Sequence, residues 1–214
     1  MWTTAHCARH SEDGAGVSFT ELLNSPGVTE ESVLAGSFGF LAFHGGLEGG
    51  TENVARTAAQ LAGASLYAVV QPPSLRWHIP SHRVRAQSSP ALAAFLGRVR
   101  TCVAVHGYGR PERPRAILLG GSNRALATLL GHELRQRVEG YEVVDELEEI
   151  PAEMRGLHQD NPVNVPPDGG VQLELPPGAR GASWRISERA APGTYVPVPG
   201  LVEALAAAAA SYGR

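Results

Sequence analysis

The chain has 214 residues, of which 43% are hydrophobic and 18% are charged, and its formal net charge is −3. This length and composition predict one globular domain, residues 1–214, and exclude an intrinsically disordered chain. Because no basic stripe is visible, nucleic acid is not expected as the main partner. Two cysteines, Cys7 and Cys102, are too few for a disulfide framework, and Cys102 lies in an apolar run typical of a core strand.

The N-terminal segment, residues 1–30, is polar and is expected to be irregular apart from a short helix at Phe19–Leu23. Its first ten residues lack the apolar core of a signal peptide. The Ala-rich stretch Leu201–Ala210 is too short to span a bilayer and contains Glu203. We therefore expect a cytoplasmic protein without a membrane partner. A terminal metal site is a further alternative to a mobile segment, and its ligands would be His6, Cys7 and His10.

A glycine-rich loop, His44–Gly50, follows the first expected core strand, Val33–Phe43, and precedes a helix at Val54–Ala62. The dense apolar run of the strand is typical of a parallel sheet that is covered on both faces. The glycines allow the backbone to bend where a Cβ atom would clash. A histidine and a carboxylate, His44 and Glu48, thus lie together at a strand end, as a divalent metal site requires. The alternative is a tight turn in which the two side chains pair or are solvated.

Strands and helices alternate through the rest of the chain, which indicates an α/β fold. The further strands are expected at Ser65–Val70, Cys102–Val105, Ala116–Leu119, Tyr141–Val144 and Gly170–Leu175. The further helices are expected at Ala91–Val99, Arg124–Val138 and Pro199–Tyr212. No internal repeat or linker indicates a second domain.

A second histidine, His106, directly follows the strand Cys102–Val105, in the same setting as His44. In open α/β sheets the strand ends along one edge form the ligand crevice, so we expect the two histidines to meet there. Another turn, Gly120–Asn123, precedes a helix. We interpret its polar residues first as helix caps and second as a binding site for a substrate carboxylate.

The strand Gly170–Leu175 carries Glu174, which completes a group of four polar residues on or just after three strands: His44, Glu48, His106 and Glu174. Two histidines and one carboxylate, with an open position for water, make a catalytic zinc site. Such a metal polarises a carbonyl group and lowers the pKa of its water. Glu174, which is not needed as a ligand, suits the general base that moves the water's proton to the leaving nitrogen. The alternative for this residue is an exposed strand glutamate.

Four segments in this order, HGGLEGGTE, WHIPSH, VAVHG and GVQLEL, followed by Arg180, resemble the poly-γ-glutamate hydrolases of phage and bacteria. The segment NPVN is also similar to the family's pattern, and the resemblance spans roughly residues 38–180. This family is related in fold to the zinc carboxypeptidases. The resemblance implies a Zn2+-dependent amidohydrolase on a three-layer α/β/α sandwich with a mixed, mostly parallel sheet. It also implies residue roles: zinc ligands His44, Glu48 and His106, and general base Glu174.

Enzymes of this family cleave γ-linked glutamate amides, and such a polymer carries a free α-carboxylate on every residue. The cleft of a similar enzyme should therefore hold cations, with arginine best suited to grip a carboxylate. The candidates for substrate binding are Arg180, His78, Arg83 and, from the NPVN segment, Asn164. The family's loop usually has one more residue between its histidine and its glutamate, which leaves Glu52 as the alternative to Glu48 as metal ligand.

The expected function is thus hydrolysis of a γ-glutamyl or related acidic amide bond by a zinc-dependent enzyme. Two alternatives stay open at this point. One is a deacylase or amidase that acts on a small molecule at the same site. The other is a metal-free domain that keeps the fold and binds an acidic ligand. The sequence does not indicate an oligomeric state.

Overall fold

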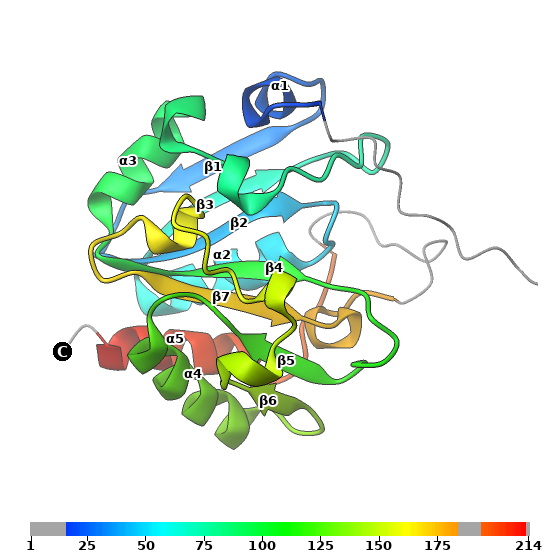
Figure 1. Cartoon of the computed structure of the whole chain (residues 1–214), viewed down its shortest axis with the longest axis vertical. Coiled ribbons are helices and arrows are strands. Elements are labelled where there is room, and N and C mark those ends of the chain that lie inside the picture. The colour runs from blue at the N-terminus through cyan, green and yellow to red at the C-terminus, as the bar shows by residue number, and fades with distance from the viewer. Residues whose placement is uncertain (1–15, 184–193, 213–214) are drawn as a thin grey trace, which may run out of the picture.

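A mixed seven-stranded sheet lies at the centre of the protein, with helices on both of its faces (Figure 1). The computed structural model describes residues 16–183 and 194–212, so the alternative metal ligands of the N-terminal segment, His6, Cys7 and His10, lie outside the described residues. Within these ranges the strand order is β1-β3-β2-β4-β7-β5-β6. The strands are β1 (Thr29–Val33), β2 (Phe38–Gly45), β3 (Ser65–Val70), β4 (Thr101–Gly107), β5 (Ala116–Leu119), β6 (Glu142–Val144) and β7 (Gly170–Leu175).

Parallel neighbours predominate in this sheet, which confirms the mixed, mostly parallel arrangement expected for the α/β fold. Strands β3, β2, β4 and β7 are mutually parallel, whereas β1 at one edge is antiparallel to β3. Strand β5 is antiparallel to β7, and β6 is parallel to β5. The carboxyl ends of β2, β4 and β7 therefore meet at one edge of the sheet, and the carboxyl end of β5 lies at the opposite edge.

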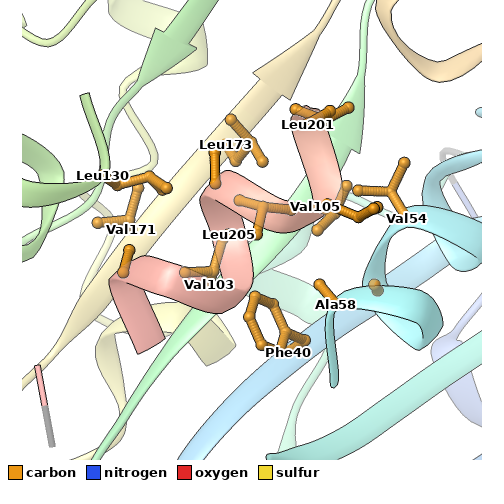
Figure 2. Packing of buried hydrophobic residues seen from close by; sticks show 14 of the residues in the cluster. Phe40, Val54, Ala58, Val103, Val105, Leu130, Val171, Leu173, Leu201 and Leu205 are labelled. Carbon is orange, nitrogen blue, oxygen red and sulfur yellow. The ribbon is translucent and has the colours of Figure 1, made fainter. Parts of the chain in front are cut away.

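Helices cover both faces of the sheet and give the expected three layers. One face packs against α2 (Thr51–Ala62), α4 (Arg124–Arg137) and α5 (Leu201–Tyr212). Figure 2 shows Leu201 and Leu205 of α5 packed over the strands, between α2 and α4. The other face packs against α1 (Phe19–Leu23) and α3 (Pro90–Arg98). None of the described helices combines the length and the apolar character needed to cross a bilayer.

Side chains of the central strands alternate between these two cores, as the two-residue period of a strand requires. In β2, Phe40 and Ala42 belong to the core with α2 and α5, whereas Leu41 and Phe43 belong to the core with α3. Cys102 of β4 is buried in this second core, which raises the pKa of its thiol and confirms it as a core residue.

The first core strand, β2, contains Phe38–Phe43 as expected but begins at Phe38, so the predicted start at Val33 is wrong. Val33 instead ends β1, an exposed and polar edge strand, and the chain reverses direction near Gly36 before β2 begins. The Ser65 hydroxyl stabilises this bend by donating a hydrogen bond to the Gly36 carbonyl (2.8 Å). Strand β1 also begins inside the segment 1–30, which was expected to be irregular. Apolar content alone does not mark where a strand starts.

Candidate metal centre

Two histidines end neighbouring strands at the same edge of the sheet. His44 lies near the end of β2 and His106 near the end of β4, and these strands are adjacent and parallel. The centroids of their imidazole rings are 5.1 Å apart, and both rings pack against the ring of Phe43. Only 2% of His44 and 5% of His106 is exposed. Parallel pairing of the two strands thus brings the histidines together.

The glycine-rich loop after β2 returns Glu48 to these histidines. It begins with a turn in which the Glu48 N–H donates a hydrogen bond to the His44 carbonyl (2.9 Å). Gly46 has a φ of +76°, and a Cβ atom there would collide with the carbonyl oxygen of Gln71. Glycine is therefore required for the loop to pass this close to the segment after β3.

Glu48 lies between the two histidines. Its Oε1 is 2.9 Å from His44 Nδ1, and its Oε2 is 3.5 Å from His106 Nδ1. The Gly107 N–H donates a further hydrogen bond to Oε2 (2.9 Å). One ligand atom from each of the three side chains lies within 4.8 Å of the other two. These three side chains, His44, Glu48 and His106, which we call the metal-ligand group, could hold a metal ion.

The hydrogen bonds of His44 indicate which of its nitrogens is available to a metal. Its Nε2 is 2.8 Å from the Ile79 carbonyl oxygen, which can only accept, so Nε2 carries a proton. In the neutral ring, Nδ1 then presents a lone pair to the Glu48 carboxylate 2.9 Å away. Two acceptors at this separation repel unless a proton or a metal cation lies between them. A backbone carbonyl bound to the distal nitrogen is also a common feature of metal-bound histidines.

The charges of this group depend on one another. Burial lowers the pKa of His44, but the charge and hydrogen bond of Glu48 outweigh burial and raise it. Burial likewise raises the pKa of Glu48, but the two histidines outweigh burial and hold it well below its usual range. Without a metal, the negative carboxylate therefore favours a proton on its histidine partner. A divalent cation can take the place of that proton.

Glu174 lies on β7 beside His106, because the two residues are paired in the register of β4 and β7. It is 7% exposed, and the Gln172 Nε2 donates a hydrogen bond to its Oε1 (2.9 Å). Burial raises the pKa of Glu174 to about 7, with a contribution from Glu48, while His106 opposes the shift. Glu174 is therefore a buried carboxyl group and not an exposed strand glutamate.

A cavity of about 730 Å³ is lined by the three residues of the metal-ligand group and by Glu174. Two of the candidate substrate residues, His78 and Arg180, line the same cavity. The centroid of the His78 ring is 4.8 Å from that of His44, so His78 lies directly beside the ligand group. The volume is in the range of pockets that bind small ligands.

Arg180 lies in a short 3-10 turn, Pro177–Arg180, and is only 7% exposed. Its Nη1 donates a hydrogen bond to the Gly49 carbonyl in the glycine-rich loop. Its Nε donates to the Leu175 carbonyl at the end of β7 (3.4 Å). Arg180 therefore connects the loop that carries Glu48 to the strand that carries the candidate base.

The other two candidate substrate residues, Arg83 and Asn164, do not occur among the described residues that line the cavity. The Asn164 side chain instead forms hydrogen bonds with backbone groups of Ser122, Gly156 and His158. Arg83 is half-buried at the end of a short 3-10 turn, Ser81–Arg83. Neither residue is retained as a substrate contact, and Asn164 has a structural role in its loop.

The turn Gly120–Asn123 lies at the opposite edge of the sheet from the metal-ligand group. Because β5 is antiparallel to β7, the turn reaches the beginning of β7, where the Asn123 N–H donates to the Gly170 carbonyl (3.0 Å). The Asn123 side chain accepts a hydrogen bond from the Leu126 N–H (2.9 Å), which confirms the helix cap. The second interpretation, a binding site for a substrate carboxylate, is wrong because the antiparallel direction of β5 puts the turn at the edge away from the cavity.

Glu52, the alternative ligand, is the second residue of α2 and is 1% exposed. It does not occur among the described residues that line the cavity. Burial, only partly opposed by nearby backbone N–H groups and Arg56, raises its pKa. Glu48 is the carboxylate beside both histidines, so the shorter loop still reaches them.

Two cavity residues were not assigned a role from the sequence. Gln172 donates a hydrogen bond to Glu174, and the strand alternation that puts both on one face is the signal that could have identified it. Tyr195 is 6% exposed and packs against Gly49, so that a Cβ on this glycine would collide with its ring. No local pattern marks Tyr195, because only the folded chain brings it to the loop.

Both the sequence and the fold resemble those of known proteins. The sequence model of the family described as poly-γ-glutamate hydrolase matches residues 18–191. The structure of a bacteriophage poly-γ-glutamate hydrolase is similar to this chain, with a TM-score of 0.68 and 25% identity over 90% of this chain and 94% of that chain. A structure described as zinc-free YNDL in its apo form has a similar fold, with a TM-score of 0.65 and 22% identity over 85% of this chain and 87% of that chain. No curated protein matches the chain.

Proposed function

The chain belongs to the poly-γ-glutamate hydrolase family, and from this premise we propose that it is a zinc-dependent hydrolase of γ-glutamyl or related acidic amide bonds. The observation that carries the proposal is the group of His44, Glu48 and His106 at the cavity, with Glu174 beside it. This group combines the ligand types of a catalytic zinc site with a carboxylate that is not needed as a ligand.

The three proposed ligands fit zinc in their donor atoms and in their hydrogen bonds. Imidazole nitrogen and carboxylate oxygen are donors that zinc accepts. In the neutral ring, the lone pair of His44 Nδ1 would face a Glu48 oxygen at 2.9 Å, an arrangement that a cation stabilises. The description of one structural relative as zinc-free supports the choice of this metal. When bound, zinc would act as a Lewis acid on a substrate carbonyl and make water acidic enough to ionise near neutral pH.

Glu174 is the proposed general base. Burial raises its pKa to about 7, so it holds a proton more firmly than an exposed glutamate does. Such a group can accept a proton from water and then deliver it to the leaving amide nitrogen. Gln172 donates a hydrogen bond to Oε1, which orients the carboxylate and leaves Oε2 to take the proton.

The substrate contacts retained in this proposal are His78 and Arg180, because both line the cavity. Every γ-linked glutamate residue has an α-carboxylate, which a cationic side chain can bind. Arg180 also has a structural role, since its guanidinium donates to the carbonyls of Gly49 and Leu175. Its loss should therefore weaken both substrate binding and the position of the loop.

Zinc content and hydrolysis, measured on the same preparation, test the proposal. Protein prepared without metal should bind about one zinc ion per chain, and zinc should restore cleavage of poly-γ-glutamate that a chelator abolishes. Cleavage that persists without metal would contradict zinc dependence. Binding of no zinc, together with binding of an acidic ligand, would support a metal-free binding domain instead.

The same preparation distinguishes polymer from small-molecule substrates. Product analysis with poly-γ-glutamate and with a panel of acylated amino acids measures both activities under identical conditions. We expect the acidic γ-linked amides to be cleaved faster. Cleavage of the small acylated amino acids alone would identify a deacylase or amidase at the same site.

A further inference from the structure

Arg76 has an unusual backbone conformation in the segment between β3 and the turn Ser81–Arg83. Its φ is +48°, and it is the only residue other than glycine with a positive φ in the described parts of the chain. L-amino acids rarely adopt this left-handed region, because the Cβ atom approaches the backbone too closely. A residue stays there only where its surroundings fix the backbone, and such residues concentrate at functional sites.

The backbone on the C-terminal side of Arg76 is held by the core and by the metal-ligand group. Gln71, which is 2% exposed, accepts a hydrogen bond from the Trp77 N–H (2.7 Å) and donates one to the Trp77 carbonyl (2.9 Å). Ile79 is fully buried, and its carbonyl accepts the hydrogen bond from His44 Nε2 (2.8 Å). These contacts fix the backbone that follows Arg76 relative to His44.

The side chain of Arg76 is exposed and lines the cavity. It has no hydrogen bond or ion pair with another residue in the ranges that the structure describes. The other two arginines among the described residues that line the cavity are already engaged. Arg110 forms ion pairs with Glu153 and Glu112, and the buried Arg180 donates to backbone carbonyls. Arg76 thus presents an unneutralised guanidinium group to the cavity.

We propose that Arg76 is a specificity-determining residue whose guanidinium binds a carboxylate of the acidic substrate beside the metal centre. This inference rests on the proposed function. A planar guanidinium can bind a carboxylate through two parallel hydrogen bonds, which selects acidic over neutral amides. Glycine would relieve the backbone strain at this position but would supply no cation.

Binding of a short γ-linked glutamate oligomer tests the inference without hydrolysis when it is measured by calorimetry in a Glu174→Gln background loaded with zinc. Arg76→Ala should raise the Kd about tenfold, as expected for the loss of one charge-assisted hydrogen-bonded pair. Arg76→Lys should recover only part of the affinity, because lysine lacks the planar fork. The same oligomer with its α-carboxylates amidated should bind the parent and Arg76→Ala equally weakly.

Arg110→Ala is the matched control, because Arg110 lines the same cavity and the substitution makes the same change in net charge. Its charge is already balanced by Glu153, so the Kd of the oligomer should change little. An equal loss of affinity in Arg76→Ala and Arg110→Ala would overturn the proposal, since it would indicate a general charge effect. An unchanged Kd in Arg76→Ala would overturn it as well.

Two further measurements separate this proposal from a purely structural role and from the proposed function. Arg76→Gly should melt at the same temperature as the parent or higher, yet should lose as much affinity as Arg76→Ala; restored affinity in Arg76→Gly would overturn the proposal. With Glu174 present, Arg76→Ala should raise KM more than it lowers kcat.

Wild-type protein that binds the oligomer through Arg76 but never hydrolyses it would contradict the proposed function alone. A parent that does not bind the oligomer would overturn both.

Discussion

At the scale of single residues, the site depends on a partly buried carboxyl group, Glu48, and a buried one, Glu174, whose pKa values are shifted in opposite directions. The two histidines hold the pKa of Glu48 well below its usual range, which favours the charged form that a metal ligand needs. Burial raises the pKa of Glu174 to about 7, which favours a group that can accept and release a proton. Surroundings that separate the pKa values of two carboxyl groups in this way are typical of sites with distinct acid–base roles.

Glu174→Gln should remove the base while keeping the shape of the site. We expect kcat to fall by about 10²- to 10⁴-fold, with zinc affinity unchanged because Glu174 is not a proposed ligand. Steady-state hydrolysis and zinc titration measure the two effects. Glu153→Gln is the control, since Glu153 lines the cavity but pairs with Arg110. Full activity in Glu174→Gln would show that another group is the base.

The raised pKa of Glu174 also predicts how the stability of the metal-free protein depends on pH. The pKa of this carboxyl group is about 7 in the folded protein, against an ordinary value of 4.5 in the unfolded chain. The contribution of Glu174 to the free energy of unfolding is therefore fully present below pH 4.5 and is lost as the pH rises through 7. At about pH 8, metal-free Glu174→Gln should therefore exceed the metal-free wild type in free energy of unfolding by up to about 3 kcal/mol. Urea unfolding at both pH values measures the difference, which should vanish at the lower pH. Equal free energies of unfolding for the variant and the wild type at the higher pH would rule out a buried, destabilising charge on Glu174.

The proximity of His44 and His106 could be predicted from the sequence because the signals are local. A histidine followed by glycine at the end of an apolar strand occurs at His44 and again at His106, and parallel pairing brings such ends together. Asn164 could not be predicted in the same way. Its side chain binds the backbone of Ser122, 42 residues earlier in the chain, and no local pattern encodes that contact.

At the scale of elements, the connection between β2 and α2 determines the geometry of the metal-ligand group. It passes so close to the chain after β3 that Gly46 cannot carry a Cβ atom. Two other segments also hold it, because Arg180 donates a hydrogen bond to the Gly49 carbonyl and the Gly107 N–H donates one to Glu48. The position of Glu48 thus depends on three elements beyond its own loop.

Gly46→Ala should therefore damage both stability and zinc binding. The φ of +76° and the collision with the Gln71 carbonyl should lower the free energy of unfolding by at least about 1–2 kcal/mol and weaken zinc binding as Glu48 moves. Gly63→Ala is the matched control, because Gly63 has a φ of +62° but no atom within 4 Å of the added Cβ. It should lose stability through strain alone and keep its zinc affinity. Equal zinc affinity in both variants would contradict the role given to the loop.

The order of elements could be predicted more reliably than their directions. Apolar runs locate β3, β4, β5 and β7 near their observed positions, because buried strands need continuous hydrophobic residues. The separation of β1 from β2 and the reversal of β5 could not be predicted, since both depend on pairing between distant strands. That reversal moves the turn Gly120–Asn123 away from the site.

At the scale of the whole molecule, the sheet brings residues from distant parts of the chain together to form the site. The ends of β2, β4 and β7 contribute His44, His106 and Glu174, and the family match over residues 18–191 includes all of them. Helices on both faces keep these strands buried, and the polar side chains at their ends, His44, His106 and Glu174, are buried where they meet the cavity. The single-domain organisation of residues 1–214 stays a prediction.

Anomalous diffraction at the zinc absorption edge, from crystals of zinc-loaded protein, tests the central claim most directly. We expect one strong peak at the cavity floor, about 2.0–2.2 Å from one nitrogen of each of His44 and His106 and from an oxygen of Glu48. A peak held by other residues, or a fully loaded crystal with no peak among these three side chains, would contradict that claim.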